Sequence, residues 1–361
     1  MMPPHLSFVR YCINEQQCIP TVTDWYALFL FMQQQALLGV GFRGIERMKE
    51  AGVDIPRNVL LKWYAIVLQI EDRNKLLNER CLELQHLFAI GGYRCCVLKG
   101  QGNALMYPQP LRRQCGDIDI WVEGKIKDVV KHLSTICEIK ESNIEYHHGE
   151  FHIWNNDVKV EVHWRPSWKS SPLYNARMQK WFKKQAGIQF SNVEKNSGLH
   201  VPTWNFNVVY QLQHMYMHFL QEGVGLRQVM DYYYLLMSIE SNSLEPKKKE
   251  LKITLQSLHL WHFAGAVMYV IKEIFDIPID KMICDPHEKD GRFLLDEILR
   301  SGNFGQYDVR NKTLMNQKGM MRKLHQVKRG MRYLRYYPEE VLCSPFRIYH
   351  VIWRKLKLWK W

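Results

Sequence analysis

Two short runs that alternate apolar and polar residues constrain the fold of this chain most. They are Gly116-Asp117-Ile118-Asp119-Ile120-Trp121-Val122 and Val158-Lys159-Val160-Glu161-Val162-His163-Trp164. An alternation with a period of two predicts β-strands with one buried face. Because successive side chains of a strand point to opposite faces, Asp117 and Asp119 should share the polar face of the first strand, and Glu161 that of the second.

If the two strands are neighbours, three carboxylates converge on one face of one sheet. Carboxylates that close repel one another unless hard divalent cations lie between them. Mg²⁺ prefers carboxylate, water and phosphate oxygens, so the arrangement favours phosphoryl chemistry. The alternative is the solvated face of a half-buried sheet, where the same alternation arises without catalysis.

The composition indicates a folded cytoplasmic protein. Of the 361 residues 47% are apolar and 12% aromatic, which argues against disorder. The nine cysteines are scattered without a CxxC pair, which favours free thiols over disulfides or a zinc site. The first 20 residues lack a basic region followed by an apolar core, so we expect no signal peptide. The most apolar run, residues 25–32, is too short to span a bilayer.

The net charge of +13 is concentrated at the C-terminus. Residues 310–361 contain 14 Lys and Arg against two Glu, so the first 309 residues carry a net charge of about +1. The segment 348–361 alternates Trp and Leu with basic residues. Such a tail suits an anionic surface, either the inner face of a membrane or a nucleic-acid backbone. The alternative is a terminal helix packed on the body of the protein, with its lysines reaching solvent.

Helix and strand signals around the two runs predict a small mixed sheet between helical regions, an α+β fold. A helix is expected up to about residue 38, and a long one over 56–90 that Gly91-Gly92 ends. Further strands are expected at 95–98, 144–146 and 151–154, with a turn at 147–149 and a helix at 125–137. Later helices are expected at roughly 173–186, 204–220, 226–238, 248–276, 289–300 and 315–336, with loops at 247–249 and 302–305. The predicted parts are a helical region 1–90, a core 91–168, a helical domain 169–310 and a basic region 311–361.

The order of these features resembles the nucleotidyltransferase fold of the DNA polymerase beta superfamily. A short strand leads into Lys99-Gly100-Gln101-Gly102 and a short helix, then the strand with two acids and, after a hairpin, the strand with the third. More narrowly, residues 56–236 are similar to a bacterial family of largely uncharacterised nucleotidyltransferases. The motifs that carry this resemblance are Leu98-Lys99-Gly100, Tyr107-Pro108, Arg113-x-x-Gly116-Asp117-Ile118-Asp119, Glu161-Val162-His163, His214-x-x-x-His218, Gly225-Leu226-Arg227 and Asp231.

The resemblance implies a metal site and a phosphate-binding loop. Asp117 and Asp119 would bridge two Mg²⁺ ions, for which Mn²⁺ could substitute, and Glu161 would hold one of them and help to activate the acceptor hydroxyl. Lys99 and Gly100 would meet the triphosphate. Related enzymes usually carry Gly-Ser at this loop, so the charge of Lys99 would stand in for the missing hydroxyl. The alternative is a turn that simply requires glycine.

Three further residues are candidates for nucleotide binding, each with a structural alternative. Arg113, next to Arg112, could meet the triphosphate or form a surface salt bridge. His163 could hydrogen-bond a metal-held carboxylate or the nucleotide, or pair with a neighbouring strand. Asp231 lies on the following helix, where the superfamily often places nucleotide contacts; it could instead pair with Arg227 at i,i+4.

Two histidines on one predicted helix, His214 and His218, have the i,i+4 spacing that can hold a transition metal. No Glu follows His214, which excludes a metalloprotease motif. The alternative is that both line the nucleotide cleft or pack against the sheet.

We therefore predict a metal-dependent transferase that moves an NMP from an NTP such as ATP to a hydroxyl of a small molecule or sugar and releases pyrophosphate. The near-neutral catalytic part offers no evident duplex-binding surface, which disfavours templated synthesis. Two alternatives stay open: a catalytically silent nucleotide-binding module, and an enzyme that acts on RNA or on a protein hydroxyl, as in toxin–antitoxin pairs. The sequence does not specify the oligomeric state.

Overall fold

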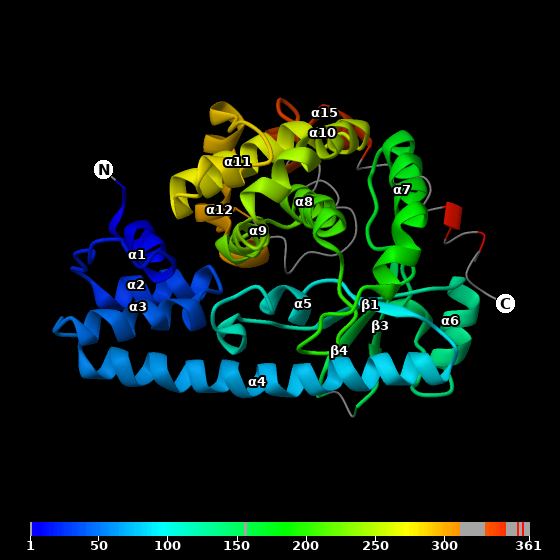
Figure 1. Ribbon diagram of the computed structural model, residues 1–361, viewed down its shortest axis with the longest axis horizontal. Helices are drawn as coiled ribbons and strands as arrows, with labels where there is room; N and C mark the ends of the chain where they lie inside the picture. Colours follow the sequence, from blue (N-terminus) through cyan, green and yellow to red (C-terminus); the bar gives the residue numbers. More distant parts are fainter. Residues whose placement is uncertain (1, 155–156, 311–328, 344–351, 354–355, 357–361) are drawn as a thin grey trace.

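A computed structural model describes residues 2–154, 157–310, 329–343, 352–353 and 356. The long helix α4 (Arg57–Ile90) runs along one side of the molecule (Figure 1). The N-terminal helices lie on its first half, the sheet on its second half, and the later helices on the far side of the sheet (Figure 1). The remaining helices are α1 (Pro4–Ile13), α2 (Trp25–Gln34), α3 (Leu38–Glu50), α5 (Gln101–Ala104), α6 (Ile126–Leu133), α7 (Pro172–Ser191), α8 (Trp204–Gln221), α9 (Leu226–Met237), α10 (Ser241–Ser257), α11 (Trp261–Phe275), α12 (Glu288–Ser301) and α15 (Pro338–Cys343).

The described residues form one mixed sheet with the strand order β1-β2-β4-β3. The strands are β1 (Cys95–Val97), β2 (Ile118–Val122), β3 (His148–His152) and β4 (Lys159–His163). The two alternating runs form β2 and β4, which pair in parallel at the centre with Asp119 opposite Glu161. The outer strands β1 and β3 pair antiparallel to them. The predicted α+β class and small mixed sheet are therefore confirmed.

Strand β2 is buried on both faces. Ile118, Ile120 and Val122 pack with the apolar face of α4 in one cluster, as the alternation predicts. On the other face Trp121 contacts Phe190 of α7 and stacks on Phe206 of α8, with ring centroids 5.7 Å apart. Helices α7 and α8 therefore cover the sheet at Trp121, whereas Asp117, Lys159 and Glu161 on the same face are only partly covered.

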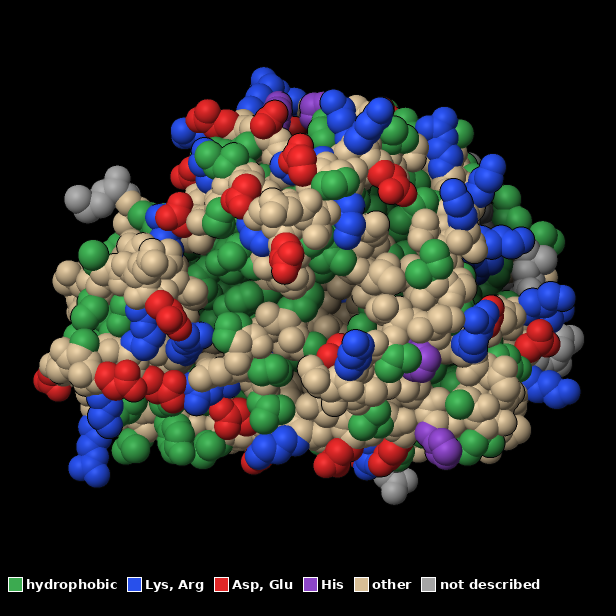
Figure 2. Space-filling model, in the orientation of Figure 1, with side chains coloured by type: hydrophobic (Ala, Val, Ile, Leu, Met, Phe, Trp, Pro, Cys, Tyr) green, Lys and Arg blue, Asp and Glu red, His purple; other side chains and the backbone are tan. Residues whose placement is uncertain are grey.

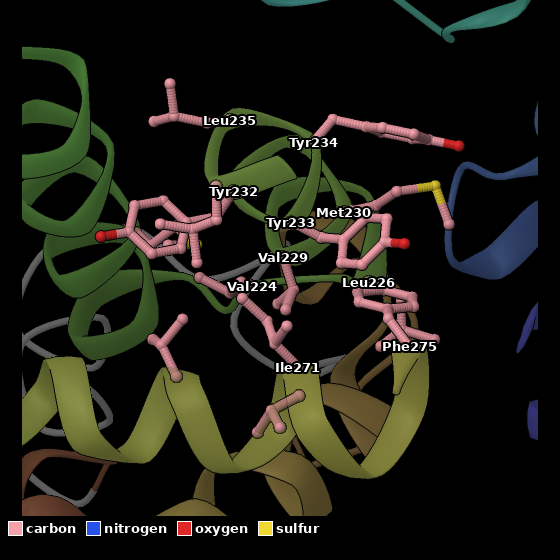
Figure 3. Close-up of a cluster of buried hydrophobic side chains, with 14 of the residues drawn as sticks. Val224, Leu226, Val229, Met230, Tyr232, Tyr233, Tyr234, Leu235, Ile271 and Phe275 are labelled. Carbon is pink, nitrogen blue, oxygen red and sulfur yellow. The ribbon is translucent and has the colours of Figure 1, made fainter. Parts of the chain in front are cut away.

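The later helices form a large apolar core above the sheet. Figure 3 shows Leu226 and Val229 of α9 on the side that faces Ile271 and Phe275 of α11, and all of these side chains are buried. Aromatic and branched side chains along α9 contribute most of its buried surface, which holds this helix in place by apolar packing. As a result α9 presents its polar residues to the sheet from a fixed position.

Several predicted elements differ from the structure. The helix expected over 248–276 is two helices, α10 and α11, and residues 247–249 lie inside α10 rather than in a loop. The helix expected to end near residue 38 is α2, which ends at Gln34, and α3 begins at Leu38. His148 and Gly149 belong to β3 rather than to a turn, and only Ile144 of the expected strand 144–146 forms a bridge. Most of the helix expected at 315–336 lies outside the described residues.

Most of the basic tail also lies outside the described residues, but Trp353 does not. Its side chain is buried beside Trp164 and meets Tyr146 edge-to-face at 6.2 Å. All nine cysteines are free thiols. Within the described part of the chain, no helix has the length and apolar character needed to cross a bilayer.

Candidate active site

The three predicted carboxylates come together at the centre of the sheet. Asp119 and Glu161 are direct neighbours across the parallel pair β2 and β4, and Asp117 immediately precedes β2. Asp119 is buried, with 3% of its surface exposed, whereas Asp117 and Glu161 are only partly covered. The β2 and β4 register thus positions the acids through backbone pairing rather than through a flexible loop.

Asp119 is held between two nitrogen groups. Lys99 Nζ lies 2.8 Å from Asp119 Oδ1, and His163 Nε2 lies 3.0 Å from the same oxygen. Burial alone would raise the pKa of Asp119, but Lys99 and His163 together hold it well below its usual value. The expectation that His163 meets a candidate metal-binding carboxylate agrees with this contact, which also joins two neighbouring strands.

Asp117 has the opposite electrostatic situation. Burial, together with the negative charges of Asp119 and Glu161, raises the pKa of Asp117 to about 6. Lys99 opposes this shift without cancelling it. A carboxylate that resists ionisation beside two others marks a place where additional positive charge would be favourable.

Oxygen donors at this place fit a divalent cation. Carboxylate oxygens of Asp119 and Glu161 and a ring nitrogen of His163 lie within 4.8 Å of one another. Glu161 is further held by Lys159 Nζ at 3.1 Å, and His148 Nε2 lies 4.0 Å away. Burial lowers the pKa of His148 to about 4, so this imidazole supplies no positive charge near neutral pH. Two carboxylates and an imidazole are ligand types that suit a divalent ion, which would compete there with Lys99 and Lys159 for the two carboxylates.

A pocket opens beside these carboxylates, with a volume of about 520 Å³ including the part open to solvent. Its floor contains Lys99, Gly100, Asp117 and Asp119, and α8 and α9 form the opposite wall. Gly100 lies between β1 and α5 with φ of +52°, and a Cβ there would lie 3.3 Å from the carbonyl oxygen of Asp117. Glycine therefore lets the loop approach the acid strand closely.

A comparison with known sequence families identifies the family of this chain. The pattern of the family described as "Uncharacterised nucleotidyltransferase" matches residues 21–276, more than half of the chain. The chain belongs to this family. No curated protein and no solved structure matches it. The predicted resemblance is confirmed, and the protein is a nucleotidyltransferase, a transferase of phosphorus-containing groups.

Arg113 and Asp231 of this nucleotidyltransferase pair with each other. Arg113 Nε and Nη2 donate to Asp231 Oδ1 and Oδ2 at 2.7 and 2.6 Å, and the Tyr107 hydroxyl donates to Oδ1 at 2.6 Å. The i,i+4 pair of Asp231 with Arg227 that the sequence also allowed is therefore replaced by this long-range pair. Neighbouring Arg112 points elsewhere and pairs with Glu46 and Glu71.

Arg227 is the functional candidate that the sequence did not single out. It lines the pocket, its Nη1 donates to the carbonyl oxygen of Gln114 at 2.6 Å, and its guanidinium lies 5.4 Å from the ring of Phe304. Its buried Nε has no hydrogen-bond partner among the described residues. Burial and the charge of Arg113 lower its pKa. A partly buried, incompletely paired cation on a pocket wall is suited to an anionic ligand.

The helical histidines meet edge-to-face, with ring centroids 4.3 Å apart, but have different polar neighbours. His214 lines the pocket, and its Nε2 lies 3.4 Å from Lys99 Nζ. His218 Nδ1 lies 3.2 Å from a carboxylate oxygen of Glu222. Neither histidine belongs to a described group able to hold a metal ion, and His214 lines the pocket whereas His218 does not, so the cleft-lining interpretation fits His214 alone. Gln211 and Phe304 also line the pocket, and no sequence signal marked them because α8 and the segment after α12 bring them there.

Proposed function

We propose that this nucleotidyltransferase moves an NMP from an NTP, with ATP the first to test, to a hydroxyl group of a small molecule or sugar and releases pyrophosphate. The observation that supports this most is the register that sets Asp119 opposite Glu161, with Asp117 beside them at the mouth of a glycine-lined pocket. Two neighbouring carboxylates, with a third directly before the same strand, fit the two-cation chemistry of phosphoryl transfer.

In this proposal each residue has a defined task. Asp117 and Asp119 would hold two Mg²⁺ ions, or Mn²⁺, and Glu161 would hold one of them and accept the proton of the acceptor hydroxyl. When bound, these ions supply charge neutralisation for the departing pyrophosphate. Lys99 would pair with the triphosphate instead of Asp119, because its ammonium competes with a metal ion for that carboxylate.

Phosphate recognition then falls to cations other than Arg113. Arg113 donates from Nε and Nη2 to Asp231 and from Nη1 to Cys115 Sγ, so in this proposal it shapes the pocket wall rather than meeting the nucleotide. Arg227, with its unsatisfied Nε, faces the same pocket and is available to a phosphate oxygen. Because Gly100 has no side chain, the backbone of its loop lies close to Asp117 and can also approach a phosphate bound there.

A small acceptor suits the charge distribution. Residues 1–309 carry a net charge of about +1. On the face shown in Figure 2, Lys and Arg side chains are interspersed with Asp and Glu, and hydrophobic side chains gather between the upper helices and the N-terminal region. A nucleic-acid duplex would call for a continuous basic surface.

The test is NMP transfer followed by mass spectrometry and pyrophosphate release. Wild type, Asp119→Asn and the exposed control Asp128→Asn are incubated with Mg²⁺, each NTP and three acceptor classes: sugars, RNA and proteins. We expect labelled sugars or small molecules with wild type and Asp128→Asn, and a loss of orders of magnitude with Asp119→Asn. Equal turnover by Asp119→Asn would refute the metal assignment. Labelled RNA or protein would establish the other acceptor class, and Mg²⁺–NTP binding without any transfer would indicate a silent module.

A further inference from the structure

A second group of potential metal ligands lies away from the carboxylates, where α11 meets α12. His262 is in the first turn of α11, His287 immediately precedes α12, and Asp290 is in the first turn of α12. Ligand atoms of the three side chains lie within 4.8 Å of one another. None of them lines the active-site pocket.

Asp290 is the unusual member of this group, because its carboxylate is buried. Only 5% of its surface is exposed, and its ion-pair partners among the described residues are the two histidines. Its Oδ2 lies 3.4 Å from His262 Nδ1 and 3.2 Å from His287 Nδ1. A buried carboxylate without Lys or Arg is unfavourable unless another cation compensates its charge.

One nitrogen of His287 faces two groups of Asp290. His287 Nδ1 accepts a hydrogen bond from the backbone N–H of Asp290 at 3.4 Å and so caps α12, and it lies 3.2 Å from Asp290 Oδ2. An imidazole nitrogen has a single lone pair, so a metal ion bound at Nδ1 would replace this cap, and the ion would then hold His287 against α12.

Close helix packing keeps the three ligands in place. The backbone N–H of His287 donates to the carbonyl oxygen of Gly265 at 2.9 Å. A Cβ on Gly265 would lie 3.0 Å from His287 Cβ, and one on Gly291 would lie 2.3 Å from Tyr269 Cβ. Both glycines therefore allow α11 and α12 to approach closely, and they hold together two ligands on these helices and a third directly before α12.

We propose that His262, His287 and Asp290 bind one divalent transition-metal ion of the Zn²⁺ type. Two imidazoles and one carboxylate suit Zn²⁺, Ni²⁺ or Cu²⁺, whereas Mg²⁺ prefers oxygen ligands alone. The side chains of His262 and His287 are 72% and 47% exposed, so water completes the coordination. The ion fastens α11 to α12 and thereby stabilises the helical half of the protein.

Calorimetric titration of the full-length protein with Zn²⁺, in excess Mg²⁺ to occupy the carboxylate site, tests this proposal. The variants are His262→Ala and His287→Ala, and the matched control is His86→Ala, an exposed histidine on α4. We expect one Zn²⁺ per chain in wild type and control, and affinity at least about tenfold weaker in each variant. Zn²⁺ should also raise the melting temperature of wild type more than that of either variant.

Two results would overturn the proposal. One is the same zinc affinity and stoichiometry in wild type and in both variants. The other is a single zinc event that survives in His262→Ala and His287→Ala but disappears in Asp119→Asn, since that ion would lie at the carboxylates. His262 is exposed, so its variant should fold, and an unchanged circular dichroism spectrum checks this.

Discussion

Replacing Arg113 by Met should destabilise this nucleotidyltransferase far more than replacing an arginine that makes the same contacts at the surface. Arg113 and Asp231 form a two-pronged pair at 2.7 and 2.6 Å, and both side chains are 6% exposed. Arg94 and Glu123 form a two-pronged pair at 2.7 and 2.9 Å, with side chains 53% and 43% exposed. The two pairs share their geometry and differ in burial.

The expected magnitudes follow from that difference. Arg113→Met leaves the Asp231 carboxylate buried with only the Tyr107 hydroxyl as a side-chain partner, and such a loss costs about 3–5 kcal/mol of unfolding free energy. Arg94→Met should cost at most about 1 kcal/mol, because solvent already screens that pair. The double variant Arg113→Met with Asp231→Leu should recover most of the loss, since it removes the buried charge as well.

Urea unfolding, followed by tryptophan fluorescence at neutral pH, measures these values. A pH series adds a second check. Burial opposes the ionisation of Asp231, but Arg113 overcomes it and holds the pKa below its usual value, so the pair stabilises the protein above that range and less as pH falls through it. The deficit of Arg113→Met should therefore shrink in acid. Equal destabilisation by Arg113→Met and Arg94→Met would refute this account of the pair.

Four further predictions concern other charged and aromatic groups. Arg227→Met should weaken NTP binding by about tenfold or more in calorimetry, because a charged hydrogen bond contributes about 1.5–3 kcal/mol; unchanged affinity would remove Arg227 from the site. Lys99→Ala should weaken NTP binding by a similar factor but strengthen Mg²⁺ binding, since the ammonium that competes for Asp119 is gone. Weaker binding of both NTP and Mg²⁺ would contradict the competition between Lys99 and the metal ion for Asp119. Burial lowers the pKa of Lys169 to about 8, so the stability of wild type relative to Lys169→Met should rise between pH 8 and about 10.5, by a few kcal/mol in unfolding experiments. If the tail packs on the body, Trp353→Ala should lower the free energy of unfolding by about 3–5 kcal/mol. If the tail instead binds membranes, removing residues 349–361 should abolish sedimentation of the protein with anionic vesicles.

The sequence predicted the centre of the sheet well because that information is local. Alternation alone identifies β2 and β4 and the polar face that carries Asp119 and Glu161, and backbone pairing then places the two acids side by side. The long helix α4 was equally readable, since Pro56 and Gly91 delimit a stretch without internal Pro or Gly. The family pattern confirms the type of enzyme.

The partners of the site residues could not be predicted, because they come from elements distant in sequence. Lys99 reaches Asp119 only through the packing of β1 against β2, and Asp231 meets Arg113 only once α9 is fixed by its apolar contacts with α11. The three consecutive lysines 247–249 suggested a loop because runs of charge are usually exposed. They lie on the partly exposed side of α10, whose other face buries Leu244, Leu251 and Leu255. The roles of Lys99, Gly100, Arg113 and Asp231 toward nucleotide stay predictions.

The length of α4 has a consequence for how the enzyme can move. Its 34 residues extend over about 51 Å, and its first half packs with the N-terminal helices while its second half underlies the sheet. Sharp kinks in helices occur mostly at Pro or Gly, and α4 contains neither. The N-terminal helices and the sheet are therefore attached to one straight, rigid helix. Any opening and closing around substrate therefore belongs to the opposite wall, where α9 and the residues after α12 approach the carboxylates from above.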